Sequence, residues 1–90
     1  MENTLQRIKR YIDFRGIRVS VLEREVGMSN GSFASQLKNN KTIGVDKLEN
    51  ILKIYGDINV EWLLTGNGNM LKEVVLEYNS PKINELKEET

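Results

Sequence analysis

The stretch VSVLEREVGMSNGSFASQLK, from Val19 to Lys38, decides the fold of this 90-residue chain. Pairs of large apolar residues four positions apart predict two short helices that each bury one face: Leu22 with Val26, and Phe33 with Leu37. Between the two helices stands Gly27, a residue type that commonly ends a helix in a left-handed conformation. Two short helices joined by a three-to-four-residue turn that contains Gly are typical of a helix-turn-helix.

The ends of these two helices are predicted from side chains that hydrogen-bond to the backbone. Ser20 and Glu23 have the spacing of a capping box, so we expect a helix over 20–26 with the Glu23 carboxylate at its own first turn. Ser29 is expected to cap the next helix, over 30–39. Asn39 and Asn40 are expected to close that helix, because Asn accepts left-handed backbone more readily than most residues.

Outward from this stretch, the apolar periodicity predicts three more helices, over 4–15, 45–55 and 60–65. Their expected caps are Asn3 or Thr4 for the first and Asn59 for the last, with glycines as end signals at Gly16, Gly56 and Gly66. The fold class is therefore all-α, a five-helix domain over 1–71. Its predicted core consists of Ile8, Ile12, Leu22, Val26, Phe33, Leu37, Leu48, Ile51, Leu52 and Leu63.

Residues 72–90 have a weaker pattern and are expected to form a C-terminal tail or linker. Two interpretations of their apolar residues stay open. In the first, they build a dimer interface together with Trp62 and Leu71. In the second, some of them cover the bottom of the helical core and the rest are expected to be disordered. The apolar residues of the tail are Val74, Val75, Leu76, Tyr78, Ile83 and Leu86.

Composition excludes several classes of function. The chain has no Cys and no His, which removes the commonest metal ligands, the thiol nucleophile and the usual general base, so we expect neither an enzyme nor a metal or cofactor site. No apolar run approaches the roughly 20 residues that span a bilayer, which predicts a cytoplasmic protein without a membrane partner. The net charge is zero, but residues 1–56 hold ten basic and six acidic residues, whereas residues 57–90 hold three and seven. Such asymmetry is a hint of a nucleic-acid surface in the first part.

The outer face of the helix expected over 30–39 carries small or hydrogen-bonding residues, which fit the major groove of DNA. N–H groups at the starts of the second and third helices, near Val19 and Ser29, are natural phosphate sites. Basic residues cluster near the ends of the same helices: Arg15, Arg18, Lys38 and Lys41. The alternative is that this face is simply the solvated side of a bundle helix.

Further residues resemble a known family, the helix-turn-helix transcriptional regulators of the phage-repressor type, called lambda-repressor-like or xenobiotic-response-element proteins. The resemblance covers about Leu5 to Leu71. Gly31 after Ser29-Asn30 and the run NVEWLLTGNGNML over 59–71 look like the branch found in Bacteroides-type bacteria and their phages. Two positions depart from the family pattern: Glu23, where a small residue is usual, and Asn40, where many members have Gly.

This resemblance implies a sequence-specific, double-stranded DNA-binding regulator, a phage-type or mobile-element repressor that binds a near-palindromic operator as a homodimer. The alternative is a protein-interaction module such as the antitoxin of a toxin–antitoxin pair. No small-molecule ligand is evident. The DNA-binding residues expected from the pattern and the resemblance together are Arg15, Arg18, Val19, Ser20, Ser29, Asn30, Gly31, Ser32, Ser35, Lys38, Asn39, Asn40 and Lys41.

Overall fold

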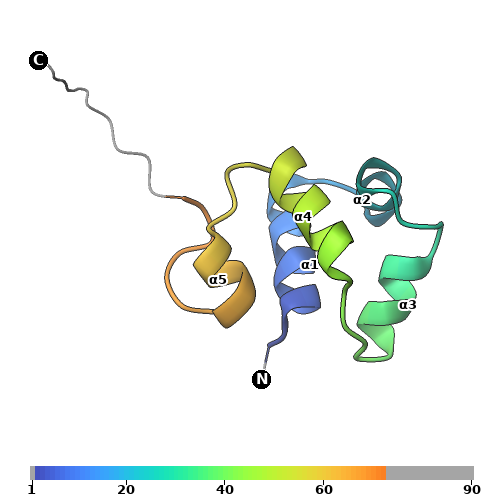
Figure 1. Ribbon diagram of the computed structural model, residues 1–90, viewed down its shortest axis with the longest axis horizontal. Coiled ribbons are helices and arrows are strands. Elements are labelled where there is room, and N and C mark those ends of the chain that lie inside the picture. The colour runs from blue at the N-terminus through green and yellow to red at the C-terminus, as the bar shows by residue number, and fades with distance from the viewer. Residues whose placement is uncertain (1, 73–90) are drawn as a thin grey trace, which may run out of the picture.

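The computed structural model describes residues 2–72, and all their regular structure beyond one isolated bridge, between Ile58 and Leu71, is helical (Figure 1). The helices are α1 (Thr4–Arg15), α2 (Val19–Val26), α3 (Ser32–Lys38), α4 (Val45–Ile54) and α5 (Val60–Thr65). The all-α class with five helices is therefore confirmed. The predictions for the tail, apart from Lys72, fall outside the described residues. Within residues 2–72 no helix is long and apolar enough to cross a membrane.

The ends of α1 and α5 follow the predicted signals. The Asn3 side chain accepts a hydrogen bond from the Gln6 N–H, and the Gln6 side chain accepts one from the Asn3 N–H, which is a complete capping box. Asn59 caps α5 in a similar way, with its side chain accepting from the Glu61 N–H. Gly16 and Gly66 end the two helices in left-handed backbone, with φ of 70° and 85°.

The apolar core lies where α1 meets the other helices. α1 packs against α2, α3 and α5, while α2 also packs against α3 and α4. Figure 1 shows α5 on one side of α1 and the α2–α3 pair toward the opposite end of the molecule. Most predicted core residues are fully buried, and three are partly buried and pack against that core: Leu37, Leu48 and Leu52.

Three details of the sequence interpretation need correction. Gly56 is not left-handed; α4 ends at Ile54, and Tyr55 is its C-cap. Val45 begins the predicted apolar stripe of α4 but is 70% exposed, because the first turn of this helix extends past the core. Trp62 is only 5% exposed, so the helical core holds it and it is not available for a dimer interface. Leu71 is partly buried against the same core, paired with Ile58.

Polar side chains of α1 hold the α5 end of the molecule together. The buried Arg7 donates from Nε to the Leu63 carbonyl, 2.8 Å away, at the C-terminal part of α5, where backbone carbonyls lack helical partners. Tyr11 donates its hydroxyl hydrogen to Asp57, and Arg15 bonds the other oxygen of the same carboxylate. Burial, followed by the hydrogen bond to Asp57, raises the pKa of Tyr11 to about 12, so the hydroxyl stays a donor at neutral pH.

Replacement of Phe33 by Ala is expected to lower the free energy of unfolding by about 3 to 5 kcal/mol, because it removes a ring that is 0% exposed and leaves a cavity. Urea titration followed by circular dichroism measures the loss. The matched control is Phe14→Ala on α1, where the ring is 61% exposed and the expected loss is below about 1 kcal/mol. Equal losses in the two variants would contradict the position of α3 in the core.

Candidate functional site

The connection between α2 and α3 is a tight turn of defined conformation. Gly27 is left-handed, with φ of 83°, and the Met28 N–H donates to the Glu23 carbonyl at 2.8 Å. Met28 turns inward and is 8% exposed, whereas Ser29 and Asn30 face solvent. Gly31 is also left-handed, with φ of 86°, and immediately precedes α3. The turn therefore buries one apolar side chain and exposes two polar ones.

Glu23 joins the two helices directly. Its carboxylate accepts hydrogen bonds from the Gly31 N–H at 2.9 Å and from the Phe33 N–H at 2.8 Å, and the residue is only 3% exposed. The first N–H groups of a helix need acceptors from outside that helix, and the residue before α3 is a glycine with no side chain to supply one. A side chain of α2 thus caps α3 and brings its negative charge to the positive end of that helix.

The capping-box prediction for Ser20 and Glu23 is consequently wrong. α2 begins one residue earlier, after Arg18, and has no side-chain cap. The spacing between Ser20 and Glu23 is correct for a local capping box, but the carboxylate gains two backbone donors by reaching across to α3 instead.

The predicted start of α3 is also wrong. α3 begins at Ser32, and Ser29 does not cap it; the Ser29 carbonyl accepts from the N–H and the hydroxyl of Ser32 and closes the turn. The N–H groups expected to bind phosphate at this helix start are partly occupied, because Glu23 takes those of Gly31 and Phe33.

At the end of α3, Asn40 has φ of 54°, which confirms the left-handed position expected there.

The predicted site residues lie, with one exception, on α2 and the residue directly before it, on the turn, on α3 and on the loop that follows α3. Val19 and Ser32 are partly buried, and the other residues of the set are exposed. The exception is Arg15, at the end of α1. Its guanidinium bonds Asp57 and the Tyr11 hydroxyl oxygen, which directs it to the connection between α4 and α5.

The pairing of charges separates the basic residues into two groups. Four of them lie within 4 Å of a carboxylate: Lys9 with Asp13, Arg10 with Glu2, Arg15 with Asp57, and Lys47 with Asp46. Within residues 2–72, no such partner is present for Arg18, Arg24, Lys38 or Lys41, which flank α2 and α3, nor for Lys53 and Lys72 elsewhere. Arg7 also has no carboxylate partner, but it donates to backbone carbonyls. Four of the six cations with neither kind of partner thus surround the α2–α3 pair.

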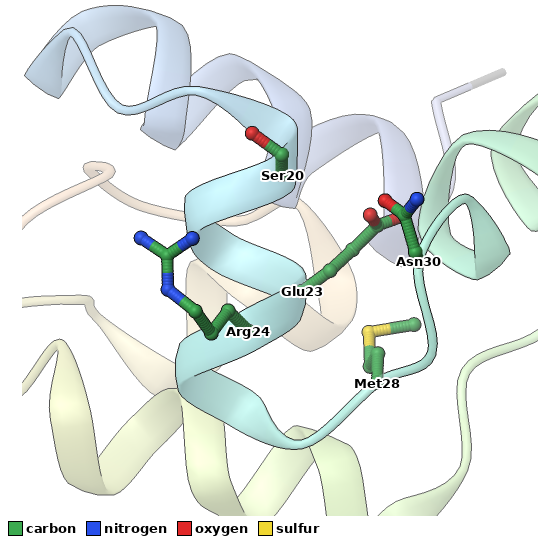
Figure 2. Close-up of a pocket in the computed structure, with 5 residues that line it drawn as sticks. All are labelled: Ser20, Glu23, Arg24, Met28 and Asn30. Carbon is green, nitrogen blue, oxygen red and sulfur yellow. The ribbon is translucent and has the colours of Figure 1, made fainter.

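Arg24 was not expected from the sequence as a site residue. It is exposed on α2, one helical turn after Ser20, and a spacing of four from that residue was the signal that could have identified it. A pocket of about 320 Å³ opens beside it, lined by Ser20, Glu23, Arg24, Met28 and Asn30 (Figure 2). The candidate site therefore combines a hollow and unpaired cations with a row of small polar side chains.

The described part of the chain contains no group of three or more acidic residues placed to hold a metal ion. The chemistry of the surface is hydrogen bonding and electrostatic attraction of anions. Comparison with known proteins adds no assignment, because no family model, no curated protein and no solved structure matches the chain.

Replacement of Glu23 by Ala is expected to cost about 3 kcal/mol of unfolding free energy, because the N–H groups of Gly31 and Phe33 lose a charged acceptor in a buried site. Hydrogen exchange at these two amides should accelerate more than in α1. The control is Glu49→Ala on α4, an exposed carboxylate with no bonded partner within residues 2–72, where a change below about 0.5 kcal/mol is expected. A loss no larger than that of the control would contradict the capping role.

Proposed function

We propose that this protein is a sequence-specific, double-stranded DNA-binding transcriptional regulator of the phage-repressor type, in which α2 and α3 form a helix-turn-helix. The observation that carries the proposal is the charge pattern: Arg18, Arg24, Lys38 and Lys41 surround α2 and α3 without a carboxylate partner in residues 2–72. Unpaired cations grouped around one surface favour the binding of a polyanion, because each phosphate that they neutralise releases counterions.

The outer face of α3 supports the same proposal. Ala34, Ser35, Lys38 and Asn39 are exposed, and none of them carries a bulky apolar group that would prevent close approach. The major groove is about 12 Å wide and admits a helix whose side chains offer hydrogen bonds to base edges. We assign base reading to Asn30, Ser32 and Ser35, and sequence-independent affinity mainly to the cations at the helix ends.

The rigid connection between α2 and α3 suits this function. A reading helix has to be held to within a fraction of an ångström if its side chains are to discriminate bases. Glu23 supplies this constraint through its two hydrogen bonds to the start of α3, while Phe33 fixes the opposite side of that helix in the core.

A homodimer on DNA completes the proposal. One reading helix contacts only about four to six base pairs, and two helices one DNA turn apart, about 34 Å, supply the remaining discrimination. Val60 and Leu64 lie one turn apart on α5 and are 41% and 46% exposed. Because α5 and α3 lie toward opposite ends of the molecule (Figure 1), this apolar face of α5 could meet a second copy without covering α3.

The central test is selection of bound sequences from a random duplex library with the full chain, followed by affinity measurements at several salt concentrations. We expect a two-fold symmetric site and a slope of log affinity against log salt of about −0.9 for each phosphate neutralised. Failure to enrich any sequence, together with an affinity that salt does not change, would exclude DNA binding and favour a protein-interaction module instead.

Two single variants test which residues read bases and which supply sequence-independent affinity. Ser35→Ala is expected to change the preferred bases by about 1 kcal/mol, since a hydroxyl that bonds a base edge is lost. Lys41→Ala should instead weaken all duplexes evenly and reduce the salt slope by about one. Repeating the selection with each variant measures both effects. If Lys41→Ala altered the base preference and Ser35→Ala did not, the proposed orientation of α3 in the groove would be wrong.

A further inference from the structure

Two asparagines of the chain are each followed by a glycine: Asn30 by Gly31, and Asn67 by Gly68. This dipeptide favours intramolecular deamidation, because glycine has no side chain to hinder attack by its own backbone nitrogen on the preceding asparagine side chain. Both asparagines are exposed, so water reaches both of them. Exposure alone therefore does not separate the two positions.

The reaction depends on the N–H group of the glycine. This group loses its proton, and its nitrogen bonds to Cγ of the asparagine. The bond between Cγ and Nδ2 breaks, ammonia leaves, and a five-membered succinimide ring remains. Water then opens the ring at either carbonyl and leaves aspartate or isoaspartate, with a new negative charge. Water is the only co-reactant, but the glycine N–H has to be free to lose its proton and to turn toward the side chain.

The N–H of Gly31 is occupied. It donates to the Glu23 carboxylate at 2.9 Å, and the same carboxylate accepts the Phe33 N–H at 2.8 Å. A carboxylate is too weak a base to remove an amide proton, and its negative charge opposes the loss of that proton. Because Glu23 is only 3% exposed, water does not readily replace it as the acceptor. The peptide between Asn30 and Gly31 is therefore held in an unreactive state.

The N–H of Gly68 has no acceptor within residues 2–72. The hydrogen bonds of this turn use other groups: the Asn67 N–H donates to Oγ1 of Thr65, and the Asn69 carbonyl accepts from the Asn59 side chain. Gly68 is itself exposed. The nitrogen that attacks the Asn67 side chain is thus free to react.

We propose that Asn67 is a site of spontaneous deamidation and that Glu23 protects Asn30 from the same reaction. Glu23 then has a chemical role in addition to its capping of α3. In the proposed function Asn30 faces DNA, where a carboxylate would repel phosphates, so the protection preserves the charge of the reading surface. The difference in reactivity itself does not depend on DNA binding.

The test follows both sites by mass spectrometry of tryptic peptides, after the full chain has been incubated at physiological temperature in mildly alkaline buffer. The two sites fall in separate peptides, 25–38 and 54–72. In the folded chain, Asn30 is expected to react about tenfold to a hundredfold more slowly than Asn67, the factor that a hydrogen bond to a charged group supplies. In urea the two should react at similar rates. Isoaspartate at position 67 should accompany the loss of ammonia, because ring opening produces it.

Glu23→Ala tests the protecting group. This variant should accelerate the reaction of Asn30 about tenfold and leave that of Asn67 unchanged, while circular dichroism shows whether the helices are retained. Glu49→Ala, which removes an exposed carboxylate of α4, is the matched control and should change neither rate.

The comparison of folded and urea-unfolded wild-type chain keeps the proposal testable even if Glu23→Ala does not fold. Equal rates at Asn30 and Asn67 in the folded wild-type chain would overturn the proposal. So would a slower reaction of Asn30 in Glu23→Ala, since Glu23 would then promote the reaction. Loss of ammonia from Asn67 without isoaspartate would contradict the succinimide route. Each of these results would leave the proposed DNA binding unaffected.

Discussion

The geometry of the candidate site depends on one buried carboxylate. α3 has seven residues, far fewer than an isolated helix needs to be stable in water, and no side chain of its own caps its first turn. Glu23 of α2 supplies the missing acceptors and Phe33 anchors the same turn in the core, so the start of α3 is held both by α2 and by the core. The exposed residues of the turn and of α3 acquire defined directions as a consequence.

Helix ends that depend on only a few neighbouring residues could be predicted well from the sequence. Asn3 and Asn59 cap the helices that follow them, and Gly16, Gly27 and Gly66 end helices in left-handed backbone, because each of these effects involves only a few neighbouring residues. The apolar periodicity likewise identified the buried faces. Glu23 shows the limit of such reasoning. Its spacing from Ser20 fits a local capping box. The start of α3, eight to ten residues away, offers the Glu23 carboxylate two N–H donors at once, and sequence spacing alone does not show which of these two arrangements is the more stable.

The sequence predicts which helices carry the candidate site better than it predicts which individual residues lie there. Lys38 and Lys41 are adjacent to α3 along the chain, and their placement follows directly from that helix. Arg15 meets Asp57, a residue 42 positions later, and only the packing of α5 against α1 brings the two together. Arg24 lies between Glu23 and Glu25 in the sequence, but both carboxylates bind other groups, so only the tertiary structure shows that Arg24 has no carboxylate partner within residues 2–72.

Two of the polar junctions between helices share a feature that affects how such a protein can evolve. Arg7 joins α1 to α5, and Glu23 joins α2 to α3, and in both junctions the second partner is backbone. A backbone carbonyl or N–H persists whichever amino acid occupies its position, apart from proline for the N–H. At these two junctions, mutational constraint therefore falls on one side chain each, and exposed positions such as Asn30 and Ser35 are free to change. A lineage could in this way acquire new surface specificities by substitution at exposed positions while inheriting the same rigid frame.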